Sequence, residues 1–249
     1  MSFRLIPCLL LSNNGLVKTQ RFKSPKYIGD PINAIRIFNE KEVDELILLD
    51  IDATKNRRPP NFALIEQLAS ECFMPFCYGG GVSSIEHVKT LFKLGVEKVS
   101  LQSSLAATPE LIREISANYG EQAVVISVDV KKNWLGKQKI HSHAGVKFSS
   151  TDWREHITTS VRLGAGEVLL SSVDHDGMRN GMDIALIQEA TKLVDVPITV
   201  MGGVGTMSDI KEAKQAGASA VAAGAYFVFQ GPHKAVLITY PRYEEIANL

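Results

Sequence analysis

Short apolar runs alternate with amphipathic segments along the whole chain. Segments such as IEHVKTLFKLG and DIKEAKQAG carry apolar residues at helical spacing and end on a glycine, which predicts helices. The apolar runs are mostly continuous rather than alternating, as expected of parallel strands that are covered on both faces. We predict eight strands, at residues 4–10, 46–50, 75–78, 98–101, 124–129, 167–172, 197–201 and 220–223.

Eight strands with intervening helices in a chain of 249 residues predict a (β/α)8 barrel, with an open doubly wound sheet as the structural alternative. An internal repeat favours closure. GGVSSIEHVKTLFKLGVEKV starts at Gly80 and GGVGTMSDIKEAKQAGASAV starts at Gly202, an offset of 202 − 80 = 122 that also pairs Glu45 with Glu167. A duplicated half-barrel explains the repeat without a linker. We therefore expect residues 1–249 to form one domain.

The amino-acid composition limits which classes of protein, and which kinds of binding partner, are consistent with the sequence. The chain is 45% hydrophobic, and its 27 basic and 27 acidic residues give zero formal net charge. This balance argues against a nucleic acid or an anionic membrane held by bulk charge. No apolar stretch approaches the ~20 residues that cross a bilayer, and nothing resembles a signal peptide. Three cysteines without zinc-site spacing suggest the reducing cytoplasm, and we expect neither a metal nor a cofactor.

Glycine-rich segments follow two strands that match in the repeat, YGGGV and MGGVG. Glycine there lets backbone N–H groups approach a phosphate at a helix N-terminus, although tight strand-to-helix turns also need glycine. Two matched sets favour phosphate over the turn explanation. LQSS and AAGA follow the next strands and complete two cradles. The residues expected to contact phosphate are Gly80, Gly81, Gln102, Ser103, Gly202, Gly203, Gly224 and Ala225.

The first and fifth strands differ at one position. Aligning IPCLL with VISVD pairs Leu10 with Asp129, because 129 − 10 = 119. No carboxylate occurs between Met1 and Gly29, so a shift of register does not supply the missing acid. A placed carboxylate contributes about 10²–10⁴-fold to proton transfer. Chemistry that needs an acid at both strand ends is therefore expected to be impaired.

The segments DELILLDIDAT, YGGGV, EKVSLQSS, VVISVDVKK, GAGEVLLSSVDHDG and MGGVGTM together resemble the cyclase subunit of imidazole glycerol phosphate synthase, over nearly the full chain. The resemblance implies that a separate glutaminase docks on the N-terminal face of the barrel and releases ammonia. The ammonia passes through the barrel to a bis-phosphate substrate at the C-terminal face. There two aspartates act as acid and base while an imidazole ring closes.

The resemblance carries over unevenly to individual residues. Asp129 matches the second catalytic aspartate, whereas Leu10 stands where the first is expected. Gln102 and Ala225 replace polar residues that are more usual in the family. The residues that the resemblance places beside the substrate are Lys18, Asp50, Ser171, Asp174 and Asp176.

Four charged residues begin strands at the opposite end of the barrel: Arg4, Glu45, Lys98 and Glu167. Spacing alone is consistent with ordinary surface charges. The resemblance implies a salt-bridged ring at the entrance to the ammonia passage, in which two positive and two negative charges limit the cost of desolvation. Glu97, next to this ring, is expected to contact the glutaminase.

A branch of the same family works with a glutaminase and an ATP-dependent amidotransferase, and converts an acetamido group to an acetamidino group on bacterial surface sugars. Because the ammonia entrance is retained and the first acid is lost, we favour this function, with a phosphorylated small molecule at the mouth. One alternative is an ordinary cyclase of histidine biosynthesis. Another is a non-catalytic module that docks and activates the glutaminase.

A few further side chains carry weaker expectations. His141 and His143 fit a solvated hairpin better than a metal site, and Cys8 fits a packed core thiol. Trp134 and Trp153 flank the irregular segment after the fifth strand, where they either cover the mouth or pack.

Overall fold

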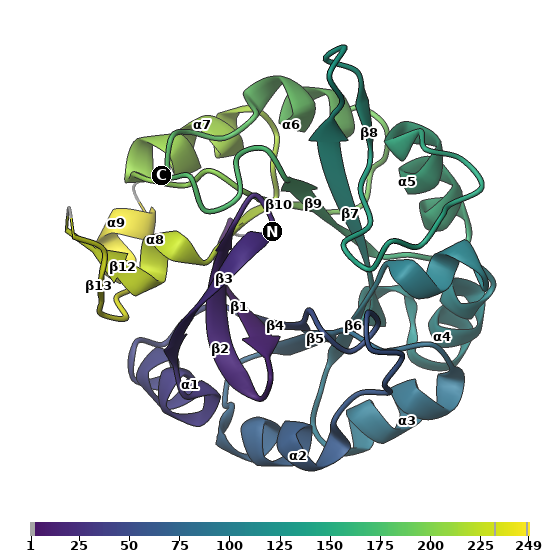
Figure 1. Cartoon of the computed structure of the whole chain (residues 1–249), viewed down its shortest axis with the longest axis horizontal. Helices are drawn as coiled ribbons and strands as arrows, with labels where there is room; N and C mark the ends of the chain where they lie inside the picture. Colours follow the sequence, from purple (N-terminus) through teal and green to yellow (C-terminus); the bar gives the residue numbers. More distant parts are fainter. Residues whose placement is uncertain (1–2, 232, 248) are drawn as a thin grey trace.

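The computed structural model describes residues 3–231, 233–247 and 249. Eight parallel strands form a closed barrel, because the first strand pairs with both the second and the last, as Arg4 does with Ala220. The (β/α)8 prediction is confirmed (Figure 1). The barrel strands are β1 (Arg4–Ser12), β4 (Leu46–Asp50), β5 (Phe76–Gly79), β6 (Lys98–Leu101), β7 (Val124–Lys132), β9 (Glu167–Ser172), β10 (Ile198–Met201) and β11 (Ala220–Ala223).

Helices surround the strands on the outside of the barrel (Figure 1). They are α1 (Pro31–Glu40), α2 (Phe62–Glu71), α3 (Ile85–Lys93), α4 (Leu111–Tyr119), α5 (Trp153–Arg162), α6 (Ile184–Ala190), α7 (Met207–Gln215), α8 (Ala225–Val228) and α9 (Tyr243–Ala247). Three of them begin 122 residues before a counterpart, since 153 − 31, 184 − 62 and 207 − 85 all equal 122. The offset found in the sequence is therefore also the offset of the structural halves.

The helix starts show why the two halves fold alike. Ser84 and Thr206 lie just before α3 and α7, and each side chain accepts a hydrogen bond from a backbone N–H of the first turn. Such caps satisfy donors that the helix itself leaves free. Asp30 and Asp152 do the same for α1 and α5, again 122 residues apart.

Apolar side chains fill both faces of the barrel wall. A large cluster lies between strands and helices, and a smaller cluster fills the barrel interior. The interior cluster consists of Ile6, Cys8, Ile47, Cys77, Val125, Leu169, Met201, Ala220 and Ala222, with Leu10 and Leu49 packed on it. Burial on both faces is the reason that the strands read as continuous apolar runs.

Two hairpins extend barrel strands beyond their predicted ends. β1 continues to Ser12 because it pairs with β2 (Gly15–Gln20), which pairs in turn with β3 (Lys23–Gly29). β7 continues to Lys132 because it pairs with β8 (Gln138–Ile140). The sequence did not predict the β2–β3 hairpin, which lies over the strand ends in Figure 1.

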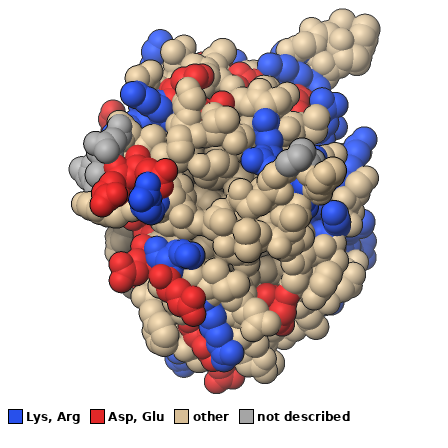
Figure 2. All heavy atoms as spheres, turned by 90° about the vertical axis from the view of Figure 1, so that its left-hand side faces the viewer, with Lys and Arg blue, Asp and Glu red and all other residues tan. Residues whose placement is uncertain are grey.

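After α8 the chain forms a short strand pair, β12 (Phe229–Gln230) with β13 (Ala235–Val236), and it then returns through α9 to a C-terminus beside α7 (Figure 1). Acidic and basic side chains are intermixed on this face (Figure 2), as the zero net charge leads one to expect. Among the described residues, no helix is long and apolar enough to cross a membrane. Trp153 is buried at the start of α5 and packs in the core, whereas Trp134 is exposed.

Candidate functional site

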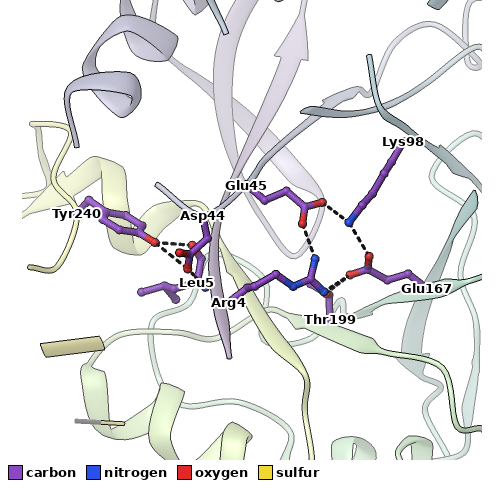
Figure 3. Close-up of polar contacts among 8 residues, drawn as sticks. All are labelled: Arg4, Leu5, Asp44, Glu45, Lys98, Glu167, Thr199 and Tyr240. Atoms are coloured by element: carbon purple, nitrogen blue, oxygen red, sulfur yellow. Dashed lines mark hydrogen bonds and ion pairs between the residues drawn. The ribbon is translucent and has the colours of Figure 1, made fainter. Parts of the chain in front are cut away.

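The four charged residues at the strand starts form a closed ring of ion pairs (Figure 3). Arg4 contacts both Glu45 and Glu167, the second at 2.8 Å. Lys98 Nζ lies 2.8 Å from Glu45 and 2.9 Å from Glu167. Each charge therefore has two partners of opposite sign, which isolated surface charges would not have.

Burial and pairing determine the charge state of this ring. Burial alone would raise the pKa of Glu167, but Lys98 and Arg4 hold it below its ordinary value. Burial alone would lower the pKa of Lys98, but the two glutamates hold it above its ordinary value. Thr199 Oγ1 also donates to Glu167, at 2.6 Å. Lys98 and Glu167 are thus held in their charged forms at neutral pH, at the N-terminal end of the barrel.

A cavity opens at the other end of the barrel, where the parallel strands present their carboxyl ends. Leu10 and Asp129 both line it, as their pairing in the internal repeat predicts. Of the other predicted site residues, those that line the cavity are Lys18, Asp50, Gly80, Gly81, Gln102, Ser103, Asp176 and Ala225.

Asp129 is the ionisable side chain best prepared for proton transfer. Burial raises its pKa to about 6, an effect that the Gln102 amide and the Ser171 hydroxyl oppose. Gln102 Nε2 donates to the carboxylate at 2.5 Å. A carboxyl group with a pKa close to neutrality can both give and take a proton during a reaction.

Leu10 presents an apolar surface where a second acid is missing. Its strand neighbours are Leu49 and Val17, and it packs on the interior cluster. The other carboxylates of the cavity hold loops in place. Asp50 accepts from two backbone N–H groups of its own turn, and Asp176 accepts from the Thr19 hydroxyl at 2.9 Å. Neither replaces a free acid at position 10.

A family model described as histidine biosynthesis protein matches residues 4–233. The chain belongs to this family. It is 50% identical over 242 residues to a Pseudomonas aeruginosa protein provisionally named imidazole glycerol phosphate synthase subunit hisF2, with 96% of this chain and 95% of the relative covered. A Vibrio vulnificus protein provisionally named subunit hisF3 is 47% identical over 240 residues, covering 96% and 92%. The subunit HisF of Exiguobacterium sibiricum is 39% identical over 227 residues, covering 90% of each chain. The chain is therefore a HisF-type subunit.

Lys18 reaches the cavity of this HisF-type barrel through a fully buried side chain. Its Nζ donates to the Cys8 carbonyl oxygen at 2.6 Å, and burial lowers its pKa. A Cβ atom at Gly224 would lie 2.0 Å from this Nζ. Gly224 is thus explained by the space that Lys18 needs.

Several predicted site residues do not line the cavity. Asp174 accepts from the backbone N–H of Lys132 at 2.9 Å, which holds it against strand β7 of the β7–β8 hairpin. Ser171 lies opposite Asp129 in the strand register, on the neighbouring strand β9. Gly203 faces the backbone of Gly181, where a Cβ atom would lie 2.0 Å from the carbonyl oxygen. The residues placed outside the cavity are Ser171, Asp174, Gly202, Gly203 and Gly224.

The cavity residues that were not predicted include Phe22, Ser104, Ser127, His143 and Gly177. Ser127 could have been predicted from the sequence, because it lies two residues before Asp129 and so faces the same side of the strand. Phe22 and His143 come from two hairpins, and their rings lie 6.3 Å apart over the mouth. Nothing in the sequence brings these loops together. Among the described residues, no group of three or more ligands suited to a metal ion occurs.

The first phosphate cradle is better formed than the second. Gly80, Gly81 and Ser103 line the cavity, and in the described part of the chain the buried Ser104 hydroxyl has no hydrogen-bond partner. Of the four residues predicted for the second cradle, Gly202, Gly203, Gly224 and Ala225, the cavity is lined by Ala225 alone, with Gly177 nearby in its lining. Glycines 80 and 81 also allow close packing, because a Cβ atom on Gly80 would lie 2.4 Å from the Asp50 carbonyl oxygen.

We predict that crystals soaked in inorganic phosphate bind one ion beside Gly80, Gly81 and Ser103, and a second beside Gly177 and Ala225. Ser104→Asp should remove only the first ion and Ala225→Asp only the second, because each adds a negative charge to one cradle. Electron density for the two variants and the unmodified protein tests this. Two empty, distorted cradles in the unmodified protein would refute it.

We predict that Asp129→Asn stabilises the fold in a pH-dependent way. The carboxyl is protonated more readily in the folded than in the unfolded chain, so its ionisation costs stability as pH rises from 3.8 through about 6. The variant should gain about 1.5 kcal/mol in free energy of unfolding at about pH 5 and about 3 kcal/mol at about pH 8. Denaturant unfolding at both pH values measures this, and an equal gain at both would contradict the raised pKa.

Proposed function

We propose that this HisF-type subunit receives ammonia from a glutaminase at its N-terminal face, conducts it through the barrel, and serves the amidination of a bacterial surface sugar. The observation that carries the proposal is the contrast between the two ends. The ring of ion pairs is complete, whereas Leu10 lines the same cavity as Asp129 at the position where closure of the imidazole needs a second acid. The barrel can supply ammonia, but it lacks half of the acid–base pair.

The lower half of the barrel supports passage of a small neutral molecule. Above the ring, the interior is lined by apolar side chains such as Ile6, Ile47 and Leu169. Neutral ammonia loses little by entering such a lining, whereas an ammonium ion would lose its hydration without gaining a counter-charge. The hydroxyls of Ser100 and Ser127 line the cavity above.

The N-terminal face offers contacts suited to a glutaminase. Phe73 precedes β5 at this end and is 85% exposed. Glu97 lies directly before the ring residue Lys98 and is also exposed. An exposed aromatic ring beside a charged residue is typical of a protein interface.

The names of two relatives support a specialised subunit. The numbers in hisF2 and hisF3 fit additional copies of a HisF subunit, which are free to serve another pathway. In the proposed function the partner that uses the ammonia is an ATP-dependent amidotransferase, and the complex works in the cytoplasm. The anion cradle near Ser103 then holds a phosphorylated small molecule at the mouth.

An ordinary cyclase of histidine biosynthesis is the second candidate. It is favoured by the retained Asp129, with its pKa of about 6, and by the first phosphate cradle. The two candidates differ in whether this cavity closes an imidazole ring at a useful rate.

The test is an assay of the purified chain with ammonium salt and the bis-phosphate substrate of imidazole glycerol phosphate synthase. We expect turnover at least about 10²-fold below that of an ordinary cyclase, because one proton-transfer group is missing. Stimulation of a cognate glutaminase in the same preparation shows that the barrel is folded. Turnover equal to that of an ordinary cyclase would overturn the proposal.

A further inference from the structure

The hairpin formed by β7 and β8 presents two apolar side chains to water. Trp134 is 90% exposed and Leu135 is 69% exposed at its tip. In Figure 1 the hairpin stands out beyond the surrounding helices, next to the label β8. Side chains of this size contribute to stability when they are buried, so a pair this exposed contributes little to this fold.

The hairpin is held rigidly from its stem to its tip. Lys131 pairs with Lys139 in the ladder, and the Asn133 side chain accepts from the N–H groups of Leu135 and Lys137, at 3.0 and 2.9 Å. At the last pair of the ladder before the tip, Lys132 Nζ lies 3.0 Å from Asp183. A tip fixed in this way loses little conformational freedom on binding, which favours affinity.

The positive charge of the hairpin indicates the charge of the partner surface that would complement it. Residues 130–151 contain no acidic residue. Four lysines flank the tip, Lys131, Lys132, Lys137 and Lys139, of which Lys132 is paired with Asp183. A complementary surface is an apolar pocket surrounded by carboxylates. One tryptophan and one leucine bury too little area to anchor a protein in lipid, so a protein surface fits better than a membrane.

The hairpin also begins and ends at the cavity. Asp129, on β7, and His143, after β8, both line the mouth. Asp129 and Trp134 are five positions apart, which at the rise of a strand corresponds to about 16 Å. A protein bound to the tip would therefore face the opening from which ammonia leaves.

We propose that the tip of this hairpin, Trp134 and Leu135 with the flanking lysines, docks an acidic protein that consumes ammonia at the mouth of the barrel. The proposal rests on the proposed function, in which an ATP-dependent amidotransferase takes that ammonia. To the proposed function, the docking proposal adds the place on the barrel where this amidotransferase binds and the side chains that hold it there.

The experiment measures the dissociation constant between the purified amidotransferase and the complex of this chain with its glutaminase. Trp134→Ala should weaken binding roughly tenfold or more, as expected of an aromatic anchor. Lys137→Glu should also weaken it, and raised salt should reduce the loss caused by Lys137→Glu. Tyr243→Ala is the matched control, because Tyr243 is 84% exposed on α9, away from the hairpin. Stimulation of the glutaminase should be unchanged in all three variants.

The possible outcomes separate the two proposals. If the amidotransferase binds the unmodified complex and Trp134→Ala equally well, the docking site is wrong and the proposed function stands. If it does not bind the unmodified complex at all, the proposed function loses its third enzyme and the docking site falls with it. Binding to phosphatidylglycerol vesicles that Trp134→Ala abolishes, without an effect on the amidotransferase, would assign the hairpin to a membrane and overturn the proposal.

Discussion

Leu10→Asp should raise the turnover of ring closure with ammonium salt by about 10²-fold, the lower end of what a placed carboxylate contributes. The new side chain would face the same cavity as Asp129 and restore a second proton-transfer group. We expect only partial recovery, because Gln102 and Ala225 would still fit the bis-phosphate substrate poorly. Steady-state kinetics of both proteins measures the change.

The same substitution should lower stability. Leu10 packs against Leu49 and the interior cluster, so an ionised side chain there exchanges apolar contact for a desolvated charge. We expect a loss of about 1–3 kcal/mol in free energy of unfolding. Leu10→Asn is the control, since it has a similar shape to the aspartate but transfers no proton. An equal gain in turnover from the asparagine would show that the acid is not the missing element.

Lys98→Glu should nearly abolish product formation that depends on glutamine, while activity with added ammonium should change far less. The substitution leaves three acids against one base in the ring, and Glu45 and Glu167 each lose a partner at 2.8 and 2.9 Å. Repulsion then disturbs the entrance but not the mouth at the opposite end. The two activities, measured on one preparation, report the two ends separately.

Stability has to be followed alongside these activities. Removing one partner from a buried ion pair typically costs about 3–5 kcal/mol, so both activities are compared at the same folded fraction. Lys98→Met is a useful second variant, because it keeps the stem of the side chain and removes the charge. Equal losses in the glutamine and ammonium assays would mean that the ring does not control the passage.

The barrel was predictable because its signals are local and repeated. Eight apolar runs, glycine stops and an offset of 122 residues recur in the structure, where α1 and α5 start 122 residues apart. The ring was predicted from the family resemblance, because spacing alone was consistent with ordinary surface charges. Its members lie at the start of a strand or directly before it, and the starts of parallel strands meet at one end of a barrel.

The details of the mouth depend on contacts between distant segments. Phe22 and His143 are 121 positions apart in the sequence, yet their rings lie close together over the cavity. No periodicity of the sequence predicts this contact. The role of a glycine could not be assigned from the sequence alone, because both phosphate binding and close packing of the chain favour glycine. Gly224 and Gly203 look like phosphate ligands in the sequence, but the structure places Lys18 against one and the Gly181 backbone against the other.

The most direct test of the central claim is growth of a strain that lacks its histidine-pathway cyclase and expresses this chain without histidine in the medium. Because Leu10 leaves Asp129 without its partner acid, we predict no rescue, even at high expression. The protein must be soluble in that strain and must still stimulate a cognate glutaminase. Robust growth with the unmodified gene would contradict the account and restore the ordinary cyclase function.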